Sequence, residues 1–334
     1  MNSIIYVIAE IGNSHEGSLG LAKKFIETVK ETGADAVKLQ THIFEFESVK
    51  NAPKPYYFKD ESREDYFNRT SFSLKDWEEL FSFSKSIGLD FISSPFSIEA
   101  FDMLEKINID GYKIASGEIT NIPLIEKISK SNKKIFISSG MSSNKEISAA
   151  VKILTQNNAD FVIMQCTSIY PCPPEKSGLN IISQFIKDFG SNNVGLSDHT
   201  EGIGVSLASI AIGARYLEKH FTLSKKMYGS DAKFSLEPHE FKVMVDEIRN
   251  IEKSLNNPVD KDLISIELTE MKHTFEKSLV YVRSLKKGQR LGAKDIGYKK
   301  PGNGIPSGDI NKVIGRILKK AIKTDEQINH NDFE

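Results

Sequence analysis

The sequence predicts a (β/α)8 barrel followed by a small β-rich domain, and two observations support this fold class. Apolar strand-like runs alternate with amphipathic helical patterns over most of the chain, which is typical of a parallel sheet wrapped by helices. The composition then changes to short strand-like runs separated by Gly and Pro turns. We therefore predict a barrel over residues 1–256, a helical linker over 257–275 and a β-rich domain over 276–334.

Eight apolar runs are predicted to be the barrel strands. They lie at Ile4–Ile11, Ala36–Gln40, Phe91–Phe96, Gly111–Ser116, Lys134–Ser139, Phe161–Cys166, Asn193–Asp198 and Tyr216–Phe221. The clearest helices are predicted at Leu19–Thr32, Leu74–Ile87, Ile98–Ile107, Asn144–Gln156, Leu179–Phe189 and Glu237–Leu255. Eight such units suit a closed barrel. An open doubly wound sheet is the alternative, but Ile11–Gly17 lacks the glycine-rich phosphate turn of that fold.

The bulk composition argues for small-molecule partners. The chain has 334 residues, with 44 Lys and Arg against 45 Asp and Glu, so no net charge attracts a polyanion or a membrane surface. Its two cysteines, Cys166 and Cys172, have neither zinc-binding nor redox spacing. We find no signal peptide and no apolar run of the roughly 18 residues that a membrane helix needs. The expectation is a cytoplasmic protein that binds neither nucleic acid nor membrane.

One long segment interrupts the alternation after the second predicted strand. Residues 41–72 are polar and aromatic, with Tyr56–Phe58, Tyr66 and Phe67 among them. Connections of this length within a compact domain are usually functional. We predict a lid over the mouth of the barrel.

Two histidines end neighbouring predicted strands. His199 follows Asn193–Asp198, His220 lies near the end of Tyr216–Phe221, and an apolar helical segment, Gly204–Gly213, separates them. In a parallel β-α-β unit both emerge at the carboxyl edge of the sheet, where α/β folds place their chemistry. Two imidazoles there can hold a transition metal and leave positions open for water and substrate. The alternative is a pair of hydrogen-bonded structural histidines, and their pairing favours the metal.

Two lysines, Lys38 and Lys113, each interrupt an apolar strand. Because an unpaired buried ammonium is costly, we expect both to hold an anion, together with hydroxyl donors from other strand ends. Those hydroxyls are Ser93, Ser94, Ser116, Ser138, Ser139, Ser168 and Ser197. The set predicts a phosphate-bearing substrate. Lys219 has a structural alternative, a solvated charge at a strand end.

Two carboxylates, Glu16 and Glu118, are candidates to bind sugar hydroxyls or to move protons. Glu118 follows the Ser116–Gly117 turn at a strand end. A strand lysine could instead form a Schiff base, as in class I aldolases. The nearby histidines favour metal-assisted chemistry over that alternative.

These residues lie in motifs that resemble the sialic-acid synthases, which condense phosphoenolpyruvate with an N-acetylated mannosamine-type sugar into nine-carbon 2-keto acids. The resemblance runs over the whole chain. Its motifs are Ile8–Gly17, Val37–Thr41, Ser93–Phe96, Tyr112–Glu118, Ser138–Met141, Gln165–Pro171, Gly195–His199 and Glu218–Phe221. It implies a barrel followed by an antifreeze-like SAF domain, in a domain-swapped homodimer where each SAF domain covers the partner's site.

The resemblance also implies roles for individual residues. His199 and His220 match the ligands of a divalent ion, Mn²⁺ in the first place and Mg²⁺ or Co²⁺ otherwise. The positions that hold phosphoenolpyruvate match Lys38, Ser94, Lys113, Ser116, Ser138, Ser168 and Ser197. Those around the sugar and the metal match Glu16, Gln40, Tyr170 and Asp231. Glu118 matches an acid near the reacting carbons, and with Glu16 and Lys113 it forms the predicted catalytic set.

The implied reaction begins when C3 of phosphoenolpyruvate attacks a sugar aldehyde that the ion polarises. Water then adds at C2, and phosphate leaves by C–O cleavage. Members that act on N-acetylmannosamine carry Lys-Arg-Pro-Gly in the SAF domain, where the arginine contacts the sugar across the dimer. This chain has Lys300 at that position, which keeps the charge but loses the planar fork.

We predict an N-acetylneuraminate synthase of a surface-polysaccharide pathway. The alternative is a legionaminate or pseudaminate synthase that acts on a 2,4-diacetamido-2,4,6-trideoxyhexose. An interaction or ice-binding role of the SAF domain is a weaker alternative, because it leaves the polar strand ends of the barrel unexplained.

Overall fold

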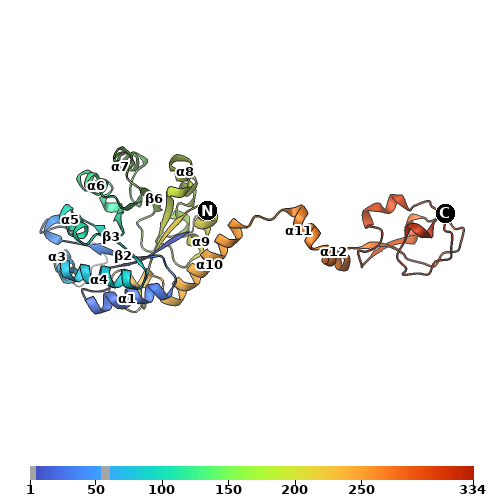
Figure 1. The fold of residues 1–334 in the computed structure, drawn as a ribbon, viewed down its shortest axis with the longest axis horizontal. Coiled ribbons are helices and arrows are strands. Elements are labelled where there is room, and N and C mark those ends of the chain that lie inside the picture. The colour runs from blue at the N-terminus through green and yellow to red at the C-terminus, as the bar shows by residue number, and fades with distance from the viewer. Residues whose placement is uncertain (1–4, 54–60) are drawn as a thin grey trace. The chain divides into compact units, whose positions relative to one another are not determined.

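A computed structural model describes residues 5–53 and 61–334, so part of the predicted lid, residues 54–60, lies outside the described residues. The chain divides into two compact units, Met1–Asn256 and Asn257–Glu334. The first unit is a closed barrel in which eight parallel strands neighbour one another in sequence order (Figure 1). The strands are β1 (Tyr6–Gly12), β2 (Ala36–Thr41), β3 (Asp90–Pro95), β4 (Gly111–Ile114), β5 (Lys134–Ser138), β6 (Phe161–Cys166), β7 (Val194–Asp198) and β8 (Tyr216–His220).

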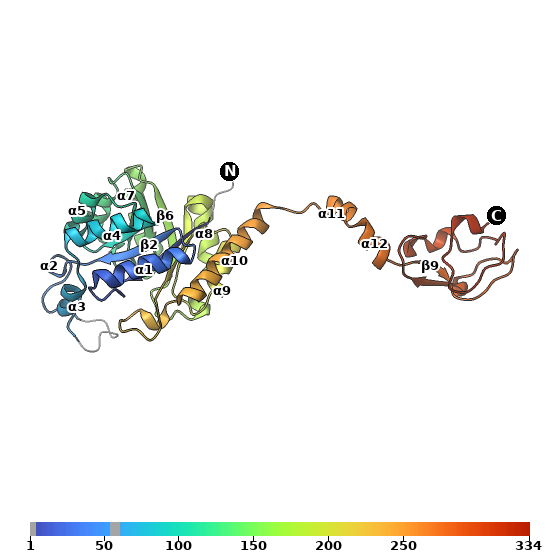
Figure 2. The ribbon, with the colours of Figure 1, turned by 60° about the horizontal axis from the view of Figure 1, so that its bottom comes forward.

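Helices surround the strands and cover their outer face, as the two views in Figures 1 and 2 show. They are α1 (Leu19–Glu31), α4 (Leu74–Ser86), α5 (Ile98–Ile107), α6 (Ile122–Ile128), α7 (Asn144–Gln156), α8 (Leu179–Phe189), α9 (Gly204–Ala211) and α10 (Pro238–Asn256). Two further short helices, α2 (Phe44–Glu47) and α3 (Arg63–Thr70), lie in the connection between β2 and α4. This is the architecture that the alternating pattern predicts. In the described part of the chain, no helix combines the length and apolar character needed to span a bilayer.

Local sequence explains where the helices begin and which face they bury. Ser73 and Ser143 are the N-caps of α4 and α7, and each forms a capping box. The serine hydroxyl accepts from the backbone N–H three residues later, and the carboxylate of that residue, Asp76 or Glu146, accepts from the backbone N–H of the serine. In α1 the buried residues Ala22, Phe25 and Val29 recur at helical spacing and pack against the strands.

The second unit has its own small core. Two short helices, α11 (Lys261–Glu267) and α12 (Thr269–Phe275), precede an antiparallel pair of strands, β9 (Ser278–Tyr281) and β10 (Ile296–Lys299). Further bridges tie the turns that follow to these strands. The buried side chains include Leu279, Tyr281, Val313, Leu318 and Ile328.

The predicted fold class is confirmed, and the differences are local. Most strand ends shift by one or two residues, because a strand boundary depends on pairing with neighbours that the sequence does not show. The sequence analysis missed α6, which is one of the shorter barrel helices. It also missed α2 and α3, which lie within the segment predicted as a lid and bring Arg63, Tyr66 and Phe67 to the mouth of the barrel.

Lys219 is a buried charge and not a solvated one, so that structural alternative is wrong. Its ammonium donates to Asp198 Oδ2 at 2.8 Å and to the backbone carbonyl of Thr200 at 2.6 Å. The side chains of Lys219 and Asp198 are each 1% exposed. The pair therefore ties β8 to the end of β7.

We predict that Lys219→Met destabilises the barrel by about 3–5 kcal/mol, because it leaves the buried Asp198 carboxylate without its partner. The single tryptophan, Trp77, is buried in the barrel, so its fluorescence during urea unfolding reports on this unit. Lys226→Met, at an exposed lysine, is the matched control. Equal urea midpoints for the two variants would contradict the prediction.

Candidate active site

Side chains on a strand alternate between its two faces, and in this barrel the alternation creates two interior layers. The lower layer is apolar and fills the barrel with Ile8, Ala36, Ile92, Phe136 and Tyr216, among others. Two residues further along the same strands, the inward positions hold Glu10, Lys38, Ser94, Ser138 and Glu218. This polar layer lines a cavity of about 420 Å³ at the carboxyl ends of the strands.

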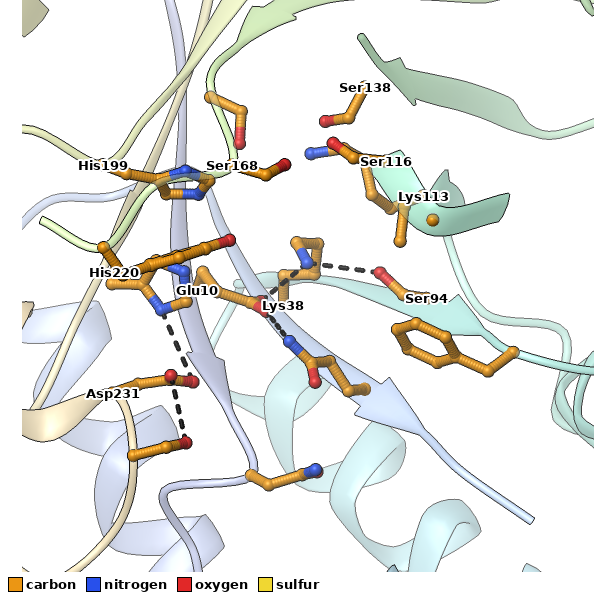
Figure 3. Close-up of a pocket in the computed structure, with 18 of the residues that line it drawn as sticks. Glu10, Lys38, Ser94, Lys113, Ser116, Ser138, Ser168, His199, His220 and Asp231 are labelled. Atoms are coloured by element: carbon orange, nitrogen blue, oxygen red, sulfur yellow. Dashed lines mark hydrogen bonds and ion pairs between the residues drawn. The ribbon is translucent and has the colours of Figure 1, made fainter. Parts of the chain in front are cut away.

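Both strand lysines are paired with carboxylates. Lys38 Nζ lies 2.8 Å from Glu10 Oε2, and Lys113 Nζ lies 2.6 Å from Glu218 Oε2. Lys38 also donates to Ser94 Oγ at 3.2 Å, and Ser197 Oγ donates to Glu218 Oε1 at 3.0 Å. All four charged residues are at most 5% exposed. Figure 3 shows Lys38 between Glu10 and Ser94.

The electrostatics of this cluster favour ionised pairs. Burial disfavours the charged form of Glu218, but Lys113 and Lys38 outweigh it and lower the pKa of this carboxyl to about 2. Burial likewise opposes the charge of Lys38, yet Glu10 and Glu218 outweigh it and raise the pKa of the ammonium. For Lys113 the balance differs, because burial together with the Lys38 charge lowers the pKa of its ammonium in spite of Glu218; the 2.6 Å contact with the Glu218 carboxylate is what keeps this lysine charged. The cavity thus holds two fixed ammonium groups beside serine hydroxyls, an arrangement that suits a phosphate or carboxylate ligand.

Three polar side chains converge around Gly140, just beyond β5. A Cβ at this position would lie 2.2 Å from Ser168 Oγ, 2.4 Å from Ser116 Oγ and 2.8 Å from Cys166 Sγ. The Gly140 N–H donates to Ser116 Oγ at 3.1 Å. Ser116, Ser138 and Ser168 lie together on one side of the cavity in Figure 3. Glycine is therefore required here so that the hydroxyls can approach one another.

The two strand-end histidines lie next to each other on the same side of the cavity (Figure 3), with ring centroids 5.4 Å apart. His199 Nδ1 lies 2.9 Å from the carbonyl of Thr167, which can only accept, so the Nδ1–H tautomer leaves Nε2 free as a ligand. His220 Nδ1 is buried without a hydrogen-bond partner among the described residues and lies 3.8 Å from Asp231 Oδ2. These donors fit a divalent transition-metal ion.

The protein does not supply a complete coordination shell by itself. Within residues 5–53 and 61–334, no three His, Cys, Asp or Glu side chains form a ready metal-binding group. Two imidazole ligands would leave several positions to water and substrate, as in a catalytic rather than a structural site. Tyr170 packs against both rings, at 4.2 Å from His199 and 5.9 Å from His220 between centroids, and holds them in place.

Most of the predicted site residues line this one cavity. They are Lys38, Gln40, Ser94, Lys113, Ser116, Ser138, Ser168, Tyr170, Ser197, His199, His220 and Asp231. Glu16 and Glu118 do not line it. Glu16 accepts from Arg69 at 2.6 Å, and Glu118 accepts from Asn121 at 2.7 Å. Lys300 belongs to the second unit, where its ammonium lies 4.9 Å from the ring centre of Phe275.

The cavity lining also includes residues that were not predicted as site residues: Glu10, His42, Arg63, Cys166 and Glu218. No local pattern marks the two carboxylates, because Glu10 meets Lys38 through the register between β1 and β2. His42 and Arg63 follow β2 in the predicted lid, where no periodicity shows which side chains point inward.

Comparison with known proteins gives one consistent result. The NeuB family matches residues 25–260, and the SAF domain matches residues 276–334. An N,N'-diacetyllegionaminic acid synthase of Campylobacter jejuni is 40% identical over 96% of this chain and 98% of that protein. An N-acetylneuraminate-9-phosphate synthase of Mus musculus is 34% identical over 98% and 92%. The crystal structure of an N-acetylneuraminic acid synthetase from Leptospira borgpetersenii, in complex with citrate, is 28% identical, with a TM-score of 0.70 over 82% of this chain and 93% of that one.

We predict that His220→Ala weakens Mn²⁺ binding at least tenfold, because it removes one of two imidazole ligands. Electron paramagnetic resonance of free Mn²⁺ measures this directly, without a turnover assay. The fold should persist, since one strand-end ligand contributes little to the core. His239→Ala, at an exposed histidine outside the cavity, is the control. Unchanged Mn²⁺ affinity in His220→Ala would refute the assignment.

Proposed function

This chain belongs to the NeuB family, and on that premise we propose that it is a sialic acid-type synthase that uses a 2,4-diacetamido-2,4,6-trideoxyhexose. It would condense this sugar with phosphoenolpyruvate to give a legionaminate-type nine-carbon 2-keto acid and phosphate. The prediction of N-acetylneuraminate synthase is not confirmed. The 40% identity to a diacetyllegionaminic acid synthase, over nearly the full length of both proteins, supports the alternative sugar better.

The residues that line the cavity support the proposed use of phosphoenolpyruvate. Phosphoenolpyruvate has a carboxylate and a phosphate, and the cavity offers Lys38 and Lys113 with hydroxyl donors around them. In the proposed reaction C3 of phosphoenolpyruvate attacks the aldehyde carbon, water adds at C2 and the C–O bond to phosphate breaks. The fixed lysines and serines hold both anionic ends, so that the chain contributes orientation and charge stabilisation.

The proposed reaction also needs a proton donor and a divalent ion, and different residues would provide for each. Burial raises the pKa of Glu118, in the turn after β4, so this carboxyl retains a proton closer to neutral pH. It does not line the cavity itself but follows the lining residues Ser116 and Gly117, and it is our candidate to supply a proton to the alkoxide formed from the aldehyde. A divalent ion, when bound to His199 and His220, supplies Lewis-acid polarisation of the aldehyde. Mn²⁺ is proposed first, with Mg²⁺ or Co²⁺ as alternatives. A Schiff base is not needed, because Lys113 is already engaged by Glu218.

The homodimer and the cytoplasmic location stay predictions. Apolar residues on the helices of the second unit support an additional partner, because Leu263, Ile266, Met271 and Phe275 are each more than half exposed. We propose that a second copy of this chain covers them and that Lys300 enters the partner's cavity to contact the sugar. The lysine would make fewer directed hydrogen bonds than an arginine there.

The decisive experiment compares acceptor sugars. Phosphate release from phosphoenolpyruvate with Mn²⁺ is measured with a 2,4-diacetamido-2,4,6-trideoxymannose, with its pseudaminate-pathway isomer and with N-acetylmannosamine, and the product is weighed by mass spectrometry. We expect kcat/KM for the first sugar to exceed that for N-acetylmannosamine at least tenfold. Preference for N-acetylmannosamine would return the assignment to a neuraminate synthase, and no phosphate release with any sugar would refute the proposed reaction.

We predict that Gly140→Ala raises the KM for phosphoenolpyruvate at least tenfold while the barrel still folds. The added Cβ would displace the hydroxyls of Ser116 and Ser168, which can rotate away without unfolding the chain. Gly20→Ala on α1 is the control, since its Cβ would meet no atom within 4 Å. A normal KM for phosphoenolpyruvate in Gly140→Ala would mean that these hydroxyls do not hold the ligand.

A further inference from the structure

An imidazole is enclosed between two aromatic rings in the wall of the cavity. His42 stacks on Phe67 at 3.9 Å and on Phe96 at 4.0 Å between ring centroids, with interplanar angles of 16° and 17°. The Arg63 guanidinium lies 5.5 Å from the ring centre of Phe67. His42 is 8% exposed, and all four residues line the cavity. The sandwich fixes the plane of the imidazole and so the directions in which its nitrogens point.

Those two nitrogens complete a chain of hydrogen bonds that starts at the centre of the barrel. Gln40 Nε2 donates to Glu10 Oε1 at 2.8 Å. Gln40 Oε1 lies 3.2 Å from His42 Nε2, and His42 Nδ1 lies 2.8 Å and 3.0 Å from the two carboxylate oxygens of Glu47. The Glu47 side chain is only 4% exposed. The chain therefore runs from Glu10 through Gln40 and His42 to a buried carboxyl on α2.

The partners at the two ends determine the orientation of the Gln40 amide. Glu10 also accepts from the Lys38 ammonium, so its carboxylate acts as an acceptor and selects the amide nitrogen. The amide oxygen must then face His42, whose Nε2 has to carry a proton in order to donate. Glu47 holds the other ring nitrogen, either as a carboxylate that accepts from Nδ1–H of an imidazolium or as a protonated carboxyl that donates to Nδ1 of a neutral ring. Burial lowers the pKa of His42, which favours the neutral ring. Both forms leave the proton on Nε2 in place.

We propose that His42 and Glu47 are positioning residues that hold the Gln40 amide in one orientation for the acceptor sugar. With one N–H bonded to Glu10 and one oxygen lone pair bonded to His42, the amide keeps one donor and one acceptor for a ligand. If the amide were turned by 180°, the donor offered to the ligand would take the place of the acceptor, and the acceptor that of the donor. The inference rests on the proposed function, because the resemblance to the sialic-acid synthases places Gln40 near the sugar. Neither His42 nor Glu47 takes part in the chemistry.

The alternative is that His42 only fills space between Phe67 and Phe96. Two substitutions separate the possibilities. Glu47→Gln removes the buried charge and keeps a partner for Nδ1, because its amide can donate there, and it serves as the parent variant. Adding His42→Phe retains an aromatic ring between Phe67 and Phe96 but removes the donor to Gln40, without leaving a buried carboxylate unpaired.

The experiment measures KM for the sugar and KM for phosphoenolpyruvate in the parent Glu47→Gln and in the double variant His42→Phe/Glu47→Gln. We expect the added His42→Phe to raise the sugar KM roughly tenfold, the loss that one well-placed hydrogen bond produces. The KM for phosphoenolpyruvate should change by less than about twofold, because Lys38 and Lys113 are untouched. In a Gln40→Ala background the same addition should change the sugar KM by less than about twofold.

Three results would overturn the inference. They are an unchanged sugar KM in the double variant, an equal rise in both KM values, or a tenfold effect that persists in the Gln40→Ala background. If the wild-type chain turns over no sugar, the proposed function fails instead. The inference is then tested by ¹H–¹⁵N spectra of the histidine rings, with His42→Phe for assignment. A proton on Nε2 of His42 would support it, and its absence would refute it.

Discussion

The burial of two ammonium–carboxylate pairs is the constraint on which the barrel and its cavity depend. An isolated charge in an apolar interior costs several kcal/mol, so Lys38 and Lys113 are tolerated only because Glu10 and Glu218 lie against them. The Glu10–Lys38 pair joins the neighbouring strands β1 and β2. The Lys113–Glu218 pair joins β4 to β8 inside the closed barrel. The apolar layer beneath excludes water and keeps the charges at one level of the barrel.

The same pairs explain how a cavity for a highly charged anion can exist before the ligand arrives. Unpaired lysines would attract phosphoenolpyruvate strongly but would destabilise the empty protein. With the carboxylates present, the four formal charges cancel, and the lysines keep donors for a ligand. Phosphate and carboxylate groups then share each ammonium with its carboxylate instead of replacing it. The Lys219–Asp198 pair is different, because it has no place in the cavity lining and serves only to join β7 and β8.

The sequence predicted the parts of the molecule that depend on periodicity. Alternating strands and helices implied the barrel, and the positions of His199, Lys38 and Lys113 at strand ends implied a shared cavity. The sequence could not show which side chains pair with the buried lysines. Glu10 and Glu218 have no local signal, since their role follows from register across β1, β2 and β8. Glu16 lies in a turn at positive φ and pairs with Arg69, a contact that no local pattern indicates, and its role at the sugar stays a prediction.

The acceptor side of the cavity is built differently from the phosphoenolpyruvate side. Strand ends provide the lysines and hydroxyls, so the barrel itself determines their geometry. His42, Glu47 and Arg63 instead follow β2 in the segment that contains α2 and α3. His42 meets the strand ends through its hydrogen bond to Gln40 and its stacking on Phe96, so this segment borders the cavity without supplying the lysines and serines. On the proposed function, the sugar would therefore be recognised partly by a segment separate from the strand ends that carry the lysines and serines.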